Sequence, residues 1–122
     1  MANNKKDLKK AHITIIVSDF EKSLKFYTEI LGLKLKNRYE NKYAEIDASG
    51  MTIGLHPYEA GHKPGNVEGI QIGFAVDNMK EAVGQLKKEG VKFTSEIIDD
   101  GWGLLVFFAD PDDNVLYLGQ MK

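Results

Sequence analysis

The sequence contains one pattern written twice, and the second copy begins 59 positions after the first. The segment 12–19 aligns with 71–78, and the segment 20–35 aligns with 79–93 when one residue is skipped. Few residues are identical, but each copy has alternating apolar residues, a polar residue, apolar residues at helical spacing and a glycine. This order predicts a strand, a capped helix and a second strand. We therefore expect two copies of one supersecondary unit.

In the first copy, isoleucine and valine alternate with Thr14 and Ile16, which predicts a largely buried strand over 13–17. Ser18 or Asp19 can cap the following helix by accepting backbone N–H bonds. The apolar stripe of this helix consists of Phe20, Leu24, Tyr27 and Leu31. Gly32 can supply the left-handed residue that ends the helix.

The second copy follows the same order, with Asp77 or Asn78 as the cap and Gly90 at the end of the helix. Its apolar stripe consists of Met79, Val83 and Leu86. Short strands separated by turn residues are predicted after each helix. In the first half they are Leu33–Asn37, Tyr43–Asp47 and Met51–Pro57, and in the second half they are Lys92–Ile98, Gly103–Phe108 and Val115–Gln120.

The element order is thus βαβββ, repeated once, and the fold class is α+β. The segment between the copies is rich in glycine and proline, which favours a linker. We predict one compact domain with four parts: a flexible N-terminal tail over 1–10, a first βαβββ module over 11–58, a linker over 59–68 and a second βαβββ module over 69–122.

Composition narrows the function classes. The chain has 122 residues and no cysteine, which excludes disulfides, thiolate zinc sites and a cysteine nucleophile. Its formal net charge of −2 provides no basic field for nucleic acid. The apolar run over 13–17 is far shorter than the roughly 20 residues that span a bilayer. We expect a cytoplasmic protein that binds neither nucleic acid nor a membrane.

The helix of one βαβββ unit covers only one face of its sheet, so the other face needs a partner. Two units placed together, within a chain or across a dimer, curl their free faces into a half-open barrel with a cavity. Small-molecule sites commonly lie in such cavities. We therefore expect a small organic ligand and a homodimer.

Two segments resemble the vicinal oxygen chelate superfamily, which groups glyoxalase I, extradiol dioxygenases, fosfomycin-resistance transferases and bleomycin-resistance proteins. They are AHITIIVSDFEKSLKFYTEILGLKL near the start and FFADPDDNVLYL near the end. The resemblance covers roughly residues 11–120. It implies a cavity that, in metal-using members, holds a divalent cation on four side chains. Those four positions here are His12, Gly54, Gln71 and Tyr117.

This quartet departs from the pattern that the resemblance implies. His12 is a good ligand for zinc, nickel or iron, but Gln71 is a weak one and Gly54 has no side chain. Strand alternation places His56 on the same face as Gly54, so a site of His12, His56 and Gln71 is conceivable, as is one with Glu45 in place of Gln71. If the protein is an enzyme, the cofactor is a divalent metal: zinc, nickel, manganese or iron.

Without a metal, the cavity keeps small residues that leave room for a ligand, together with aromatic walls and a few polar groups. Such a surface suits an aromatic or amphipathic ligand. The predicted binding residues are His12, Thr52, Gly54, His56, Gln71, Gly73, Trp102 and Tyr117. Ala75, Tyr39 and Tyr43 are further candidates for the cavity lining.

Our leading hypothesis is a metal-independent small-molecule binding protein of the bleomycin-resistance type, with no cofactor. The alternative is a metal-dependent lyase like glyoxalase I, or a dioxygenase, that uses His12 with a relocated second ligand. A third possibility is a metal-free enzyme that polarises a substrate carbonyl through His12 and Tyr117.

The segment 110–114 begins like a calcium-binding loop, but Val115 stands where such a loop needs glycine. We predict a turn in which Pro111 takes the second position and Asn114 tolerates positive φ. Members of the superfamily usually have glycine where Asp113 stands, so this turn is expected to be slightly strained.

Overall fold

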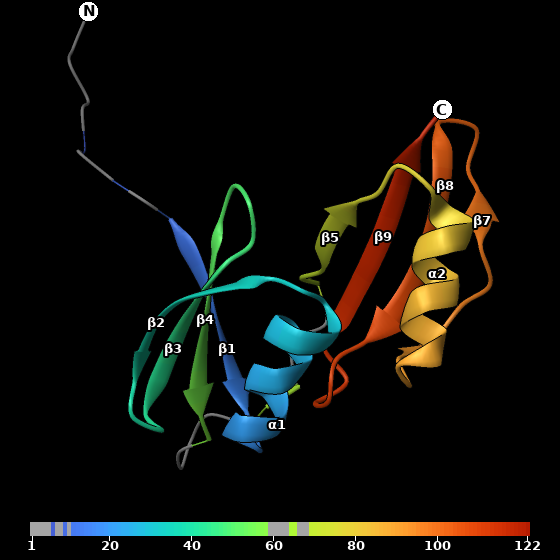
Figure 1. The fold of residues 1–122 in the computed structure, drawn as a ribbon. Coiled ribbons are helices and arrows are strands. Elements are labelled where there is room, and N and C mark those ends of the chain that lie inside the picture. Colours follow the sequence, from blue (N-terminus) through green and yellow to red (C-terminus); the bar gives the residue numbers. More distant parts are fainter. Residues whose placement is uncertain (1–5, 7–8, 10, 59–63, 66–68) are drawn as a thin grey trace, which may run out of the picture.

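The structure is a computed structural model that describes residues 6, 9, 11–58, 64–65 and 69–122. Most of the expected tail over 1–10 and of the linker over 59–68 therefore lies outside the described residues. The first half contains the predicted βαβββ order, the second half contains one strand more, and each half forms its own sheet (Figure 1). The α+β class is confirmed, with one sheet of four strands and one of five.

The first sheet has the strand order β1-β4-β3-β2, in which β1 and β4 are parallel and the other pairs are antiparallel. The elements of this module are β1 (His12–Val17), α1 (Phe20–Lys25), η1 (Phe26–Ile30), β2 (Lys34–Tyr39), β3 (Tyr43–Asp47) and β4 (Thr52–Pro57). Asp19 is the N-cap, since its side chain accepts from the Lys22 backbone N–H at 3.1 Å.

The second sheet has the order β5-β9-β8-β6, and β7 also pairs with β8. Its elements are β5 (Ile72–Ala75), α2 (Met79–Lys88), β6 (Lys92–Phe93), β7 (Ile98–Asp99), β8 (Gly103–Ala109) and β9 (Val115–Met121). Asn78 caps α2 by accepting from the Glu81 backbone N–H at 3.1 Å. The glycines expected after the helices, Gly32 and Gly90, have φ of 74° and 83°.

The prediction of one strand over Lys92–Ile98 is wrong, because the segment forms two short strands with an irregular stretch between them. Phe93 pairs with Phe108 and Ile98 pairs with Leu105, so five steps along this segment oppose only three along β8. The two surplus residues cannot join the ladder. The Ser95 hydroxyl accepts from the Phe107 backbone N–H at 3.0 Å and takes the place of a strand carbonyl.

The helix expected after β1 begins as an α-helix and continues as a π-helix. Over Phe26–Ile30 it is a π-helix, in which the Leu31 backbone N–H donates to the Phe26 carbonyl at 2.9 Å. Such widened turns are rare and insert one extra residue per turn. Tyr27 lies in this segment and is completely buried.

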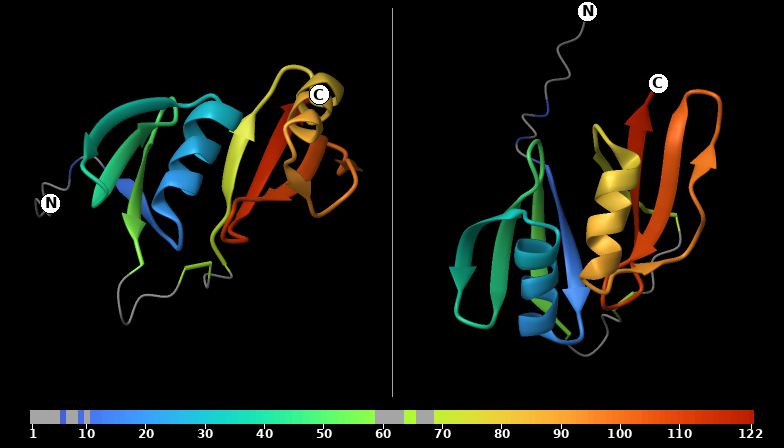
Figure 2. Two further views of the ribbon diagram at one scale, coloured as in Figure 1. Left: turned by 60° about the horizontal axis from the view of Figure 1, so that its bottom comes forward. Right: turned by 45° about the vertical axis from the view of Figure 1, so that its right-hand side comes forward.

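Each helix lies against one face of its own sheet, and no helix of the described residues lies on the opposite face (Figures 1 and 2). The buried core lies on the helix side, and strand alternation directs the intervening residues to the open side. We call these helix-free surfaces the first open face, on β1-β4-β3-β2, and the second open face, on β5-β9-β8. The largest fully buried side chains are Tyr27, Phe108, Ile46, Ile53, Leu55, Met79 and Leu116.

A buried polar contact joins the two modules. The Tyr27 hydroxyl donates to Asp110 Oδ2 at 2.6 Å, across 83 positions of sequence. Asp110 also accepts from the Asp112 and Asn114 backbone N–H groups at 2.9 and 2.8 Å, and from Asn114 Nδ2 at 2.8 Å. Burial, reinforced by the charge of Asp110, raises the pKa of Tyr27 far above its ordinary value. The phenol therefore remains a proton donor.

Asp110 also explains the conformation of its turn. Positive φ falls on Asp113, at 63°, and Asn114 is not among the residues with positive φ. The expectation for Asn114 was therefore wrong. Its backbone N–H and its side-chain amide both donate to Asp110. The left-handed residue is therefore Asp113, the position at which the resemblance implies glycine.

Candidate ligand-binding site

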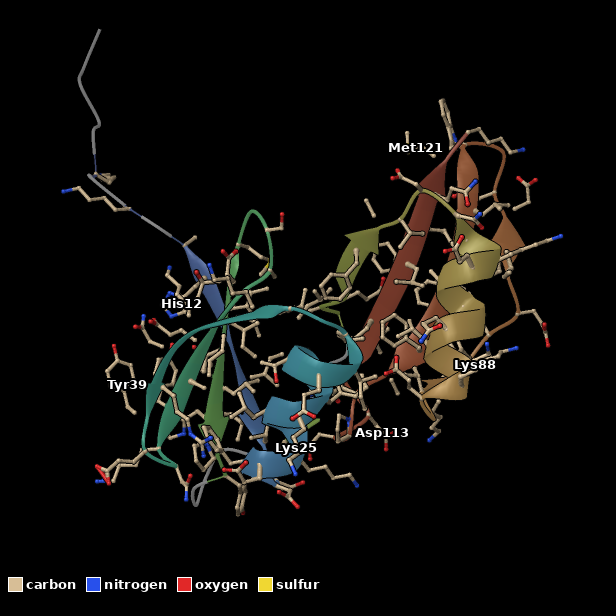
Figure 3. The ribbon with its side chains drawn as sticks, viewed as in Figure 1. His12, Lys25, Tyr39, Lys88, Asp113 and Met121 are labelled. Atoms are coloured by element: carbon tan, nitrogen blue, oxygen red, sulfur yellow. The ribbon has the colours of Figure 1, made fainter. Side chains whose placement is uncertain are left out.

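The first open face carries four of the predicted site residues. His12 is exposed at the start of β1, and its Cα partner on β4 is Thr52. Gly54 opposes Thr14, and His56 opposes Ile16, on the same two strands. Figure 3 shows His12 and Tyr39 on this module, whereas Met121 lies on the other module.

The space that Gly54 was expected to leave is filled by a tyrosine ring. A Cβ atom built at Gly54 would lie 2.9 Å from Tyr43 Cε1. Tyr43 stacks on Tyr39, with ring centroids 6.2 Å apart, and its ring centroid lies 6.4 Å from that of His56. Aromatic side chains cover strand glycines in this way because a glycine leaves no side chain to pack against its neighbours.

His56 is fixed by its own backbone neighbour. Its Nδ1 lies 2.8 Å from the Pro57 carbonyl oxygen, which can only accept, so Nδ1 carries the proton. Glu45, on the adjacent strand, accepts from Asn37 Nδ2 at 2.8 Å. Among the described residues, no three His, Cys, Asp or Glu side chains are grouped to hold a metal ion.

The residues at the four implied metal positions do not fit a catalytic divalent metal. They provide one imidazole, one amide, one phenol and a glycine that lies under Tyr43. Catalytic zinc sites normally have three protein ligands, and the carboxylate and thiolate donors are missing from this set. Tyr117, in addition, lies across Gly73: a Cβ there would be 2.6 Å from Tyr117 Cε1.

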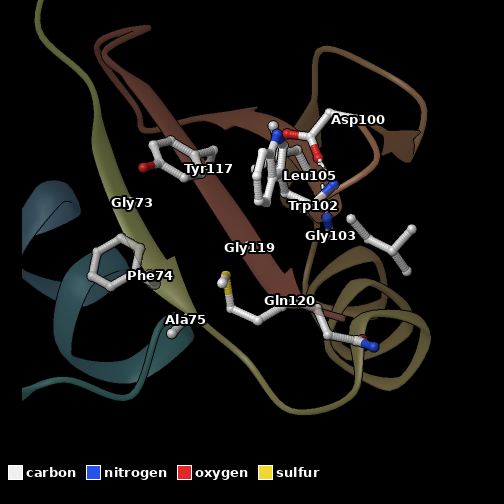
Figure 4. Close-up of a pocket in the computed structure, with 12 residues that line it drawn as sticks. Gly73, Phe74, Ala75, Asp100, Trp102, Gly103, Leu105, Tyr117, Gly119 and Gln120 are labelled. Atoms are coloured by element: carbon white, nitrogen blue, oxygen red, sulfur yellow. Dashed lines mark hydrogen bonds between the residues drawn. The ribbon is translucent and has the colours of Figure 1, made fainter.

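A cavity of about 340 Å³ lies on the second open face (Figure 4). We call it the indole pocket, because Trp102 stands at its edge with 80% of its surface exposed. Met121 is 81% exposed beside it. The pocket is lined by Gly73, Phe74, Ala75, Asp100, Trp102, Gly103, Leu104, Leu105, Tyr117, Gly119, Gln120 and Met121. This lining is predominantly apolar.

The turn before β8 holds Trp102 in place. Asp100 Oδ1 accepts from the Trp102 and Gly103 backbone N–H groups at 2.9 and 3.0 Å. Gly101 has φ of 92°, which glycine adopts without strain. The Lys122 backbone N–H donates to the Trp102 carbonyl at 3.1 Å, so the turn is also tied to the end of β9. Trp102 is thus exposed on a well-defined backbone.

Asp99 forms the outer part of the same turn. Its Oδ1 accepts from the Gly101 backbone N–H at 2.9 Å, and its Oδ2 lies 3.0 Å from Lys122 Nζ. The Gly101 hydrogen bond, followed by the contact with Lys122, lowers the pKa of Asp99. Asp99 is therefore an ionised residue whose charge is balanced by Lys122.

The structure brings Gly73, Trp102 and Tyr117 together in the indole pocket. It places His12, Thr52, Gly54 and His56 on the other sheet, and Gln71 is exposed just before β5. Leu105, Gly119 and Met121 also line the pocket and were not predicted from the sequence. The alternation of side chains along β8 and β9 could have predicted the first two, because Leu105 opposes Gly119 and both lie on the same face as Tyr117.

A larger cavity of about 560 Å³ lies between the modules on their helix side. Ile30 and Leu31 contribute from the first module, and Ala82 and Leu86 contribute from α2. Of the residues predicted to line a cavity, Gly73 and Ala75 reach it, but neither Trp102 nor Tyr117 does. We therefore take the indole pocket as the candidate site.

Two modules of this kind, each with one helix on one face of its sheet, define the paired βαβββ class of α+β proteins. The model of the Glyoxalase/Bleomycin resistance protein/Dioxygenase superfamily matches residues 9–118. The chain belongs to this superfamily.

Relatives of known name include the lactoylglutathione lyase of Salmonella typhimurium, which is 28% identical over 124 residues and matches across 91% of both chains. The lactoylglutathione lyase of Schizosaccharomyces pombe is 30% identical over 132 residues, covering 84% of this chain. This chain spans only 44% of the length of that relative.

Solved structures have the same fold. TnmS3, an antibiotic binding protein from Streptomyces sp. CB03234, has a TM-score of 0.80 at 23% identity and matches 98% of this chain and 100% of its own. A superfamily member from Sphaerobacter thermophilus is 31% identical, with a TM-score of 0.75 over 93% of this chain and 97% of its own. In the part of the chain that the structure describes, no helix has the length and apolar character needed to cross a membrane.

Proposed function

We propose that this protein binds a small aromatic or amphipathic organic molecule in the indole pocket, without a metal ion. The observation that carries the proposal is Trp102, an exposed indole held by a rigid turn over an apolar cavity. Ligand pockets have volumes of about 300–1,000 Å³ and are lined mainly by apolar and aromatic side chains. The indole pocket has about 340 Å³ and that type of lining.

The energetic argument rests on apolar surface that faces solvent. Trp102 and Met121 are each at least four-fifths exposed, so a ligand that covers them removes apolar area from water. Such burial stabilises a complex by about 25 cal/mol per Å², and an aromatic ligand gains about 0.5–1.5 kcal/mol more for each stacked ring. TnmS3 is named as an antibiotic binding protein, and its likeness to this chain makes that ligand type a reasonable choice.

We also propose that the protein is a homodimer. The described part of the chain leaves both open faces uncovered, and the first carries aromatic side chains such as Tyr39, 55% exposed. A second copy is a natural cover for such surfaces, as exposed apolar patches commonly mark interaction sites. Sedimentation velocity tests this: a single species with twice the chain mass supports the dimer, and a species with the mass of one chain contradicts it.

We expect Trp102→Ala to weaken binding of 2-naphthylmethanol by about tenfold or more, because the substitution removes the largest aromatic surface of the pocket. The free energy of unfolding should change by less than about 0.5 kcal/mol, since the side chain is exposed. Titration calorimetry measures the first quantity and urea denaturation the second. Tyr58→Ala removes an aromatic ring that is 51% exposed outside the pocket lining, and it should leave binding unchanged. Equal affinities for wild type and Trp102→Ala would rule out the indole pocket.

A metal-dependent lyase or dioxygenase is the second candidate, and the names of the lactoylglutathione lyase relatives favour it. In that case His12, His56 and Gln71 are the ligands to examine. Elemental analysis of protein purified without chelator and then offered nickel, zinc, manganese and iron(II) separates the candidates. We expect substoichiometric metal that dialysis removes. Tight binding of near one ion per chain or per dimer would instead support the enzyme, and His12→Ala should then abolish both metal and turnover.

A further inference from the structure

The indole pocket carries a negative charge as well as an apolar surface. Of its twelve lining residues, Asp100 alone carries a full charge at neutral pH, and none is basic. Figure 4 shows Asp100 beside Trp102 at one end of the pocket, with hydrogen bonds to the backbone of the turn. A ligand in the pocket therefore meets a carboxylate next to an indole ring.

The carboxylate of Asp100 is fixed through one oxygen and can contact a ligand through the other. Oδ1 accepts both backbone N–H groups of the turn, while the Asp100 backbone N–H donates to the Gly103 carbonyl at 3.2 Å. Within the described residues, no hydrogen bond or ion pair involves Oδ2. One oxygen thus fixes the carboxylate on the turn, and the other can accept from a ligand.

The neighbouring charges do not cancel Asp100. Lys122 Nζ lies against Asp99 Oδ2 at 3.0 Å, so the ammonium group that the described residues bring to this turn pairs with the other carboxylate. Two carboxylates and one ammonium leave the turn with a net negative charge. A positively charged group over an indole face is also attracted by the ring, and tryptophan is the strongest of the aromatic residues in this respect.

We propose that the indole pocket selects organic cations, in which a flat apolar body lies on the sheet and a positively charged nitrogen lies between Asp100 and Trp102. This inference rests on the proposed function and specifies its ligand class. The same charge disfavours anionic ligands, because a carboxylate ligand and Asp100 are both negatively charged. Net repulsion at close range disfavours such a ligand.

Three probes with the same ring system test the proposal: 2-naphthylmethylammonium, 2-naphthylmethanol and 2-naphthoate. The protein has a single tryptophan, so the indole N–H gives one NMR resonance that reports pocket binding for each probe. We expect the cation to bind about three- to tenfold more tightly than the alcohol, and the carboxylate to bind more weakly than both. High salt should reduce the preference for the cation, because the charge is exposed to solvent.

Asp100→Asn is the critical variant, since its amide oxygen can still accept the two backbone hydrogen bonds of the turn. It should lose most of the preference for the cation over the alcohol and keep only the part that comes from the indole face of Trp102. Asp113→Asn removes one exposed carboxylate far from the pocket lining and should keep the wild-type preference. Lys122→Gln, which leaves Asp99 unbalanced, should increase that preference.

The outcomes distinguish a failure of the charge selectivity from a failure of the indole pocket itself. Equal affinities of wild type for the three probes, with a shift of the Trp102 resonance, overturn the charge selectivity while supporting the pocket. An unchanged preference in Asp100→Asn also overturns it. If no probe shifts the resonance at millimolar concentration, the indole pocket itself is refuted, and the proposed function fails with it.

Discussion

Asp110→Ala is expected to lower the free energy of unfolding by about 3–5 kcal/mol, because it removes the acceptor at the centre of a buried polar network. Asp110 is 4% exposed and accepts four hydrogen bonds, one from Tyr27 on the other module. Its loss leaves a buried phenol and two turn N–H groups without acceptors. Urea denaturation followed by circular dichroism measures the change.

Asp112→Ala is the matched control for this prediction. Asp112 is two residues away and its carboxylate also reaches the first module, where it accepts from the Ser18 backbone N–H at 3.1 Å. That contact is exposed, so its loss should cost less than about 1 kcal/mol. Similar effects of the two substitutions would show that the buried network does not hold the modules together.

The elements that the sequence predicted well are those determined by neighbours a few positions apart. Apolar periodicity defined the strands and helices, and the side chains of Asp19 and Asn78 cap their helices within three residues. Gly32 and Gly90 end the helices for an equally local reason. The repeat then placed these elements in two modules without any information about long-range contacts.

The features that the sequence did not predict depend on register or on distant partners. Tyr27 was expected to be buried, but its hydroxyl acceptor lies 83 positions away and no motif announces the pair. The ring of Tyr43 reaches Gly54 only because β3 and β4 pair in one particular register. The two surplus residues within 92–98 become visible only when that segment is compared with β8.

In the candidate site, too, local features could be predicted from the sequence and long-range contacts could not. Trp102 was predicted as a binding residue, and its side chain is 80% exposed at the edge of the indole pocket. The alignment of His12 with Gln71 comes from the repeat alone, and it contains no information on whether the two side chains share a cavity. In the single chain, Gly73, Trp102 and Tyr117 line one pocket, while His12 lies on the other sheet.

Tyr27→Phe should change how stability depends on pH. At neutral pH the variant loses the hydrogen bond to Asp110, which should cost about 1–3 kcal/mol because a buried carboxylate loses a donor. Burial and the nearby charge of Asp110 raise the pKa of Tyr27 in the folded protein, whereas the unfolded chain has a tyrosine pKa of about 10. The folded state therefore retains a proton that the unfolded state releases above pH 10.

The difference between the folded and unfolded pKa of Tyr27 determines whether its contribution to stability rises or falls with pH. The contribution of the protonated phenol is complete below about pH 10 and decreases as the pH rises further, by up to about 1.4 kcal/mol per pH unit. Tyr27→Phe has no proton to release at this position, and the four other tyrosines are the same in both proteins. The stability advantage of wild type should thus narrow from pH 10 to pH 11.5 in urea denaturation, and the two curves should approach each other. Parallel curves over this range would contradict a buried Tyr27 that stays protonated against Asp110.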